Sequence, residues 1–236
     1  MGHGIAQVCA QAGLAVALYD LAEEPLARGL KGIETFLAKS VAKGKLQAEE
    51  AAAMRARVRG TTNLADACAG ADVVIEAVPE NLDLKRHLFA EVERAAAPGT
   101  LLASNTSSLA IGAIAGALRR PERFLGMHFF NPVPLMTLLE VVTGPRTAPA
   151  ATEAALALGR RLGKEPIVVN DSPGFASSRL GVAIGLEAIR MVEEGVASAA
   201  DIDKAMELGY RHPMGPLRLT DLVGLDVRLG IAEYLA

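Results

Sequence analysis

The chain of 236 residues is long enough for one large domain or two modest ones with a substantial buried core. Its 51% hydrophobic and 22% charged residues are typical of a folded globular protein and exclude an intrinsically disordered one. A net charge of −3 argues against a nucleic-acid-binding protein, and no apolar run reaches the roughly 20 residues of a membrane span.

Strand-like and helix-like segments alternate along the first 170 residues. The predicted strands are residues 14–19, 58–61, 72–78, 100–103, 124–129, 138–142 and 166–169. The predicted helices are residues 3–12, 23–57 with a break near Lys43 and Gly44, 81–96, 109–117 and 149–162. This alternation predicts an α/β fold with a mainly parallel sheet.

The character of the sequence changes after Asp171. A long helical stretch continues to about residue 194, two further helical segments follow, and no strand pattern is found. We therefore expect one α/β domain at residues 1–170 and a second, all-helical domain at residues 171–236.

Two cysteines, Cys9 and Cys68, stand outside any metal-type spacing. We expect buried free thiols, with a disulfide between them as the minor alternative. The first residues lack the basic and apolar segments of a secretion signal. The sequence therefore predicts a cytoplasmic protein without a metal site.

The first 20 residues contain part of a nucleotide-binding pattern. A dinucleotide-binding unit needs a strand, a glycine-rich turn, a helix, a second strand and a carboxylate for the ribose hydroxyls. Gly2 and Gly4 begin a helix, and Asp20 closes the next strand, 18 residues after Gly2. The pattern predicts a Rossmann-type domain that binds NAD, because a carboxylate at Asp20 repels the 2′-phosphate of NADP. The alternative is that both glycines are merely flexible terminal residues.

The first strand and first two glycines of that unit have no counterpart in the chain. The first strand is central in such a sheet, so its absence would leave the edges of two neighbouring strands unpaired. We therefore expect the sequence to be incomplete at its N-terminus.

Six segments along the chain together resemble the L-3-hydroxyacyl-CoA dehydrogenase family, including bacterial 3-hydroxybutyryl-CoA dehydrogenases. They are MGHGIAQVCA at the start, EAVPENLDLKRHLF at 76–89, SNTSSL at 104–109, GMHFFNPVPLMTLLEVV at 126–142, DSPGFASSRL at 171–180 and HPMGPLRLTDLVGLD at 212–226. The resemblance implies NAD-dependent, reversible oxidation of a short-chain L-3-hydroxyacyl-CoA. It also implies that the helical domain binds substrate, forms a homodimer and is cut short at its C-terminus.

One histidine and one glutamate suit this chemistry. Oxidising a carbinol requires a base for the hydroxyl proton, usually a histidine whose imidazole a carboxylate orients. His128 ends one predicted strand, and Glu140 lies in the next, where a carboxylate among apolar residues is costly unless paired. The turn between them allows antiparallel pairing or adjacent strand ends. By itself His128 would be interpreted as a core histidine, but the family's catalytic pair falls on His128 and Glu140.

The resemblance implies two further contacts with the cofactor. Ser107 matches a catalytic position that contacts substrate and nicotinamide, although it could also be a helix N-cap, for which Ser108 is the better candidate. Asn131 matches a cofactor-contacting position, and its alternative role is a turn residue before Pro132.

Charged residues complete the implied binding site. Glu80 and Lys85 match cofactor-side positions, and Lys85 is also a candidate for CoA binding. Lys31 matches a CoA-contacting lysine, which suits the phosphates of CoA. Without the resemblance, either lysine would be interpreted as a solvated residue on a helix face.

Ser178 departs from the family pattern, which usually has asparagine immediately before the arginine of this motif. That asparagine helps to position substrate beside the catalytic histidine. Serine is shorter and lacks the NH2 donor, so Ser178 would act through a water or lower the rate. We keep Ser178 among the catalytic positions.

Two other functions stay open. One is a dehydrogenase of a non-CoA hydroxy acid on the same scaffold. The other is a truncated or repurposed relative that binds nucleotide or dimerises without turnover. The missing glycines and Ser178 favour this second alternative, whereas the intact His128, Glu140 and Ser107 weigh against it.

Overall fold

The computed structural model describes residues 1–235, which form two compact units. The first unit comprises Met1–Thr106 and Ala110–Asp171, and the second comprises Ser107–Leu109 and the residues from Ser172 onward. Within the described chain, all strands belong to the first unit. The predicted fold class, a Rossmann-type α/β region followed by a helical one, is confirmed.

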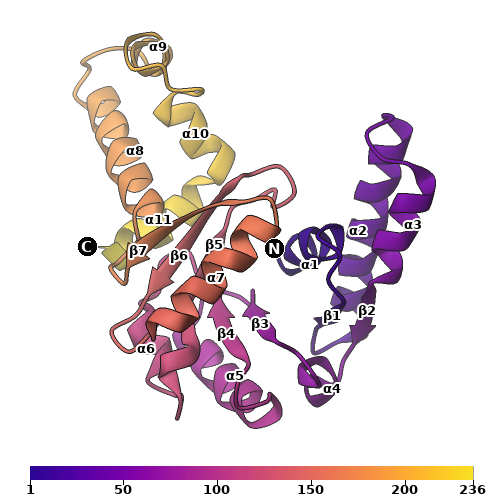
Figure 1. Ribbon diagram of the computed structural model, residues 1–236. Helices are drawn as coiled ribbons and strands as arrows, with labels where there is room; N and C mark the ends of the chain where they lie inside the picture. Colours follow the sequence, from indigo (N-terminus) through magenta and orange to yellow (C-terminus); the bar gives the residue numbers. More distant parts are fainter. Residues whose placement is uncertain (236) are drawn as a thin grey trace. The chain divides into compact units, whose positions relative to one another are not determined.

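Helices and strands alternate in the first unit as predicted (Figure 1). The strands are β1 (Val16–Tyr19), β2 (Val58–Thr61), β3 (Val73–Glu76), β4 (Leu101–Ser104), β5 (Phe124–Phe129), β6 (Leu138–Thr143) and β7 (Glu165–Asn170). The helices are α1 (Gly2–Gln11), α2 (Glu23–Ala42), α3 (Ala48–Ala56), α4 (Leu64–Cys68), α5 (Leu82–Ala95), α6 (Ile111–Ala115) and α7 (Pro149–Arg161), with a 3₁₀ turn η1 (Pro121–Arg123). Helix α4 is missing from the prediction because its five residues are too few to show a helical period.

The strands form two sheets. Strands β1 and β2 make a parallel pair, and the other five lie in the order β3-β4-β5-β6-β7. Neighbours in this larger sheet are parallel except for β5 and β6, which are antiparallel. Among residues 1–235, β1 and β3 each have one edge without a strand partner.

One face of the larger sheet packs against α1 and α7, and Figure 1 shows α7 lying along the sheet. Alternate residues of a strand point to the same face, so every second residue of β5 enters this core. The core includes Ile5 and Val8 of α1, Leu125, Met127 and Phe129 of β5, Val141 of β6, and Ala155 and Leu156 of α7.

The opposite face packs against α5 and α6. The ring of Phe89 in α5 meets the ring of Phe124 edge to face, with centroids 4.7 Å apart. A Cβ on Gly126 would lie 2.9 Å from Ile111 in α6, so glycine lets this helix approach the strand closely. His128 follows Phe124 and Gly126 at intervals of two residues and therefore lies on this face.

The second unit contains α8 (Ser177–Glu193), α9 (Ala199–Gly209), α10 (Pro216–Val223) and α11 (Leu225–Leu235). The sequence predicts only two helical segments after the long one, and that prediction is wrong, because three follow within residues 1–235. Gly224, at φ +100°, ends α10, and α11 begins at the next residue. Since no polar loop separates them, the two helices cannot be distinguished by sequence pattern.

Two predictions from composition can be compared with the structure. Both cysteines are free thiols, with Cys68 buried and Cys9 half-buried. None of the described helices combines the length and the apolar character that crossing a membrane requires.

Candidate active site

His128 and Glu140 face each other across the antiparallel strands β5 and β6. The Nδ1 atom of His128 lies 2.7 Å from Oε2 of Glu140. Both side chains are buried, at 6% and 0% exposure. Of the two arrangements that the sequence allows, antiparallel pairing is therefore the one found. A buried carboxylate in this position can orient the imidazole and stabilise its protonated form.

Asn105 links β5 to the segment that follows β4. Its side-chain Oδ1 accepts a hydrogen bond of 2.8 Å from the backbone N–H of Phe129, the neighbour of His128. The backbone N–H of Asn105 in turn donates to the carbonyl of Glu76, over 2.8 Å. Asn105 is 8% exposed and holds the end of β5 in place. The sequence analysis does not single it out, although its buried amide lies in the SNTSSL segment.

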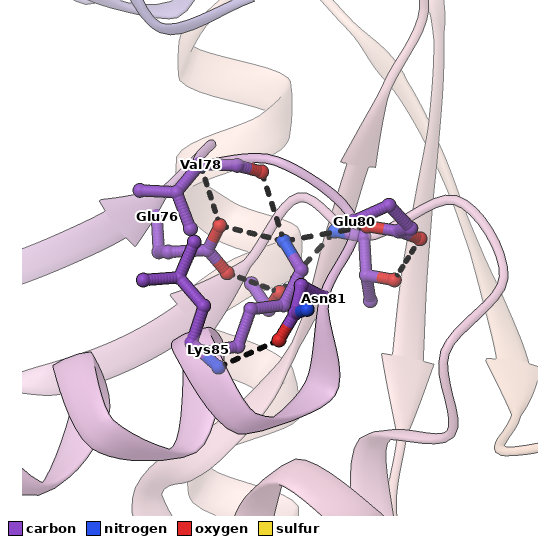
Figure 2. A network of polar contacts seen from close by, with 8 residues as sticks. Glu76, Val78, Glu80, Asn81 and Lys85 are labelled. Atoms are coloured by element: carbon purple, nitrogen blue, oxygen red, sulfur yellow. Dashed lines mark hydrogen bonds and ion pairs between the residues drawn. The ribbon is translucent and has the colours of Figure 1, made fainter.

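A buried ion pair lies on the same face of the sheet. Figure 2 shows Glu76 at the end of β3, with Lys85 of α5 beside it. The Nζ atom of Lys85 lies 2.7 Å from Oε1 of Glu76, and both side chains are at most 2% exposed. The carboxylate of Glu76 also accepts hydrogen bonds of 2.6 Å each from the Ser104 hydroxyl and the Val78 N–H.

This ion pair changes the interpretation of Lys85. A lysine at such a helix position is ordinarily expected to be solvated. For Lys85 that expectation is wrong, because the residue is 1% exposed. Its ammonium group has three internal acceptors: Oε1 of Glu76, the carbonyl of Val78 at 3.2 Å and Oε2 of Glu80 at 3.3 Å. The contacts with Glu76 and Val78 are hydrogen bonds, and the contact with Glu80 is an ion pair.

Glu80 is the more exposed carboxylate of this group. Its side chain is 37% exposed, and its Oε1 atom accepts a hydrogen bond from the hydroxyl of Thr106. Glu80 thus reaches the segment that follows β4, next to Asn105. The sequence analysis misses Glu76, although the reasoning that selected Glu140, a carboxylate within an apolar strand, applies equally to it.

The N-terminal part of the chain has features that suit the binding of a dinucleotide. Helix α1 has no side-chain cap and no acidic residue in its first turn, so its free N–H groups suit an anionic phosphate. Gly2 opens the helix. Asp20 follows β1, is half-buried, and has neither a hydrogen bond nor an ion pair within residues 1–235. These features fit the phosphates and the ribose of NAD.

A small cavity of about 110 Å³ lies beside α1. Gly4, Gln7, Phe36 and Asn131 are among the residues that line it. Gln7 is 2% exposed, and its side-chain nitrogen has no hydrogen-bond partner in the described part of the chain. A buried donor at a cavity suits a polar ligand. Asn131 itself is exposed, as a ligand contact requires.

Lys164 fixes the loop between β5 and β6. Its ammonium donates to the carbonyls of Val133 and Met136, at 2.5 and 2.7 Å. Lys164 is 8% exposed, and burial lowers its pKa below 10.5. The loop that joins His128 to Glu140 and carries Asn131 is thus held by a buried cation.

The remaining predicted site residues are Lys31, Ser107 and Ser178. Lys31 lies on α2 with its side chain 76% exposed and 3.6 Å from Glu34. Ser107 is half-buried in the 107–109 segment of the second unit, and Ser178 is half-buried in the first turn of α8.

The predicted capping roles of Ser107 and Ser108 are wrong. Helix α6 begins at Ile111, and its N-cap residue is Ala110. The carboxylate of Asp171 accepts the backbone N–H groups of Ile111 and Gly112, at 2.8 and 2.7 Å. A residue 60 positions along the chain therefore provides the cap that local sequence could not reveal.

The chain matches both domains of one enzyme family. Residues 1–172 match the 3-hydroxyacyl-CoA dehydrogenase NAD binding domain, and residues 174–236 match the 3-hydroxyacyl-CoA dehydrogenase C-terminal domain. A probable 3-hydroxybutyryl-CoA dehydrogenase of Bacillus subtilis is 45% identical over 235 residues, covering 100% of this chain and 82% of the relative.

Other relatives agree. The human mitochondrial hydroxyacyl-coenzyme A dehydrogenase is 47% identical over 240 residues, covering 99% of this chain and 76% of the human protein. The crystal structure of (S)-3-hydroxybutyryl-CoA dehydrogenase from Ralstonia eutropha superimposes with a TM-score of 0.95 at 42% identity. That match covers 100% of this chain and 83% of the Ralstonia chain.

Proposed function

This chain belongs to the 3-hydroxyacyl-CoA dehydrogenase family, and we propose that it is an NAD-dependent oxidoreductase that interconverts L-3-hydroxyacyl-CoA and 3-oxoacyl-CoA in fatty acid metabolism. The observation that carries the proposal is the buried contact of 2.7 Å between His128 and Glu140. The proposed substrate is short, 3-hydroxybutyryl-CoA, because relatives that match the whole chain are named for it.

In this proposal, His128 is the acid–base catalyst. Its Nδ1–H donates to Glu140, which leaves Nε2 as the nitrogen that takes the hydroxyl proton of the substrate. Glu140 keeps the imidazole in this tautomer and stabilises the positive charge that forms on it. In the reverse direction, the imidazolium returns the proton to the carbonyl oxygen.

The chemistry that a bound NAD would supply is acceptance of the hydride from the carbinol carbon. The residues proposed to hold NAD are Gly2 at the start of α1, Asp20 after β1, Glu80 and Asn131. Lys85 belongs to the cofactor site as well, but its buried ion pair favours an indirect role there. The unpartnered carboxylate of Asp20 supports a contact with ribose hydroxyls.

Three residues are proposed to contact the substrate. Ser107 and Ser178 are the proposed contacts near the reacting oxygen, and Ser107 also contacts the nicotinamide. Lys31 is the proposed contact with CoA, and its exposed ammonium on α2 is available for a phosphate. Residues 171–236 would then form the substrate and dimerisation domain.

A direct assay tests this function. The purified chain is mixed with NAD⁺ and (S)-3-hydroxybutyryl-CoA, and NADH is followed by its absorbance; acetoacetyl-CoA with NADH tests the reverse direction. We expect turnover of the thioester and little turnover of free 3-hydroxybutyrate. Equal rates on acid and thioester would favour a non-CoA dehydrogenase. Binding of NADH without turnover would favour a non-catalytic relative.

We also propose a homodimer that forms through the second unit. Large apolar side chains are exposed there, including Leu180 on α8, Leu208 on α9, Leu222 on α10 and Leu225 on α11. Exposed apolar groups of this number are typical of an interface. Sedimentation equilibrium gives the mass directly, and a monomer at micromolar concentration would contradict the proposal.

A cytoplasmic location is part of the same proposal. Cys9 and Cys68 are both free thiols, as is usual in a reducing compartment. Cell fractionation with an antibody against the chain tests it, and recovery outside the cytoplasmic fraction would contradict it.

A further inference from the structure

Two carboxylates at the proposed cofactor site share one ammonium group. The carboxylates of Glu76 and Glu80 lie 2.7 and 3.3 Å from Nζ of Lys85. With all three groups ionised, two carboxylates and one ammonium give a formal net charge of −1. The Glu76–Lys85 pair is buried, whereas the side chain of Glu80 is 37% exposed. Glu80 is therefore the member of this group that reaches the surface.

A series of contacts connects Glu80 with the histidine. The hydroxyl of Thr106 donates to Glu80, and the preceding residue, Asn105, accepts from the backbone of Phe129, next to His128. Strand β3, which leads to Glu80, is separated from β5 by β4 alone. Adjacent strands lie about 4.8 Å apart, so β3 and β5 lie on the order of 10 Å apart, and Glu80 lies in the loop that follows β3.

Lys85 is placed to act through Glu80 rather than on a ligand. It is 1% exposed, and its ammonium donates two internal hydrogen bonds and forms an ion pair with Glu80. Glu76 is held more firmly still, because its carboxylate accepts hydrogen bonds from Lys85, Val78 and Ser104. Both residues therefore fix the loop between β3 and α5, where Glu80 lies (Figure 2).

We propose that Glu76 and Lys85 are positioning residues that hold Glu80, and that the net negative charge of the three groups favours oxidised over reduced dinucleotide. The oxidised nicotinamide ring carries a positive charge that the reduced ring lacks. A negative charge at the proposed cofactor site therefore stabilises the bound oxidised form selectively. This inference rests on the proposed function, since it takes NAD as the cofactor.

The test is the ratio of two dissociation constants, Kd for NAD⁺ divided by Kd for NADH, measured on the full chain by fluorescence titration and competition. Glu80→Gln removes one negative charge at a partly exposed position, where the fold tolerates it. We expect the ratio to rise about 3- to 10-fold, given partial screening by water and salt. Glu76→Gln should shift the ratio in the same direction.

A charge-conserving double variant separates charge from structure. Glu76→Gln combined with Lys85→Met removes one negative and one positive charge, so the formal net charge stays at −1. We expect its ratio to lie within about 2-fold of the wild-type ratio, even where both constants change. A double variant that shifts the ratio as far as Glu76→Gln alone would overturn the proposed effect of the net charge.

Asp83→Asn is the matched control. It removes the same charge from the first turn of α5, but the side chain of Asp83 is 95% exposed and fully screened. Its ratio should equal that of the wild type. The inference is overturned if Glu80→Gln leaves the ratio unchanged, or if Asp83→Asn shifts it equally. A wild-type chain that binds neither dinucleotide would instead contradict the proposed function.

Discussion

His128 and Glu140 occupy directly opposite positions of the antiparallel strands β5 and β6, with Nδ1 and Oε2 2.7 Å apart. Both strands are buried over most of their length. Backbone pairing of β5 with β6 on either side of the two residues holds them opposite each other. A catalytic pair mounted on two adjacent strands has little freedom to separate. The strand register itself therefore sets the geometry of the proposed acid–base catalyst.

Replacing His128 should remove the proton acceptor. We expect His128→Gln to lower kcat about 10²- to 10⁴-fold, the usual contribution of a positioned general base. The measurement is steady-state NADH formation from 3-hydroxybutyryl-CoA. His87→Gln is the control, because His87 is a surface histidine whose side chain is 77% exposed. A His128 variant with full activity would show that the assignment is wrong.

Replacing Glu140 should weaken catalysis through the imidazole. Glu140→Gln keeps the size of the side chain but removes the charge that stabilises the imidazolium, so we expect kcat to fall about 10²- to 10⁴-fold. KM should change little, because Glu140 contacts His128 rather than substrate. Glu153→Gln, at an exposed position of α7, is the matched control. A change confined to KM would contradict this role.

Asn105 should contribute mainly to stability. Asn105→Ala leaves the buried N–H of Phe129 without its acceptor, which costs about 1–3 kcal/mol of unfolding free energy. Urea denaturation measures the loss. Asn170→Ala, at an exposed position of β7, should change stability by less than about 0.5 kcal/mol. Equal effects of the two substitutions would argue against the Asn105 contact.

Lys164 should make the free energy of unfolding depend on pH in the alkaline range. Burial lowers its pKa below 10.5 in the folded protein, so between the lowered pKa and 10.5 the unfolded chain binds more protons than the folded one. The free energy of unfolding therefore gains a contribution that rises with pH in this window.

The variant Lys164→Met isolates this contribution. We expect the unfolding free energy of the wild type, minus that of the variant, to increase between about pH 7 and about pH 10. Urea denaturation at both pH values measures it, with Lys39→Met on the exposed face of α2 as control. A difference that is independent of pH would contradict the lowered pKa.

Cys9 should react slowly with thiol reagents in the native protein. Burial raises the pKa of its thiol to about 11, so only about 0.1% is thiolate at about pH 8. Burial raises the pKa of Cys68 too. We expect slow labelling by a disulfide reagent in buffer and rapid labelling of both thiols in guanidinium chloride. Rapid labelling of the native protein would contradict the burial of these residues.

The local hydrophobic pattern of the sequence was sufficient to predict most of the helices and strands. Residues 124–129 and 138–142 are apolar and rich in strand formers, and the structure has strands at Phe124–Phe129 and Leu138–Thr143. Hydrophobic period is a property of neighbouring residues, so it can be recognised without a structure. Short or uninterrupted segments, such as Leu64–Cys68 and the junction at Gly224, lack such a period and were missed.

The sequence by itself determined the order of most elements, the family and the identity of the paired residues His128 and Glu140. Only the tertiary structure decided that Lys85 is buried against Glu76, and that Asp171 caps α6. Burial and long-range hydrogen bonds depend on which surfaces meet after folding, and no local period records that. The pairing of His128 with Glu140 was therefore predictable from the family resemblance together with a carboxylate in an apolar strand. The charge group around Lys85 became visible only once α5 was packed on the sheet.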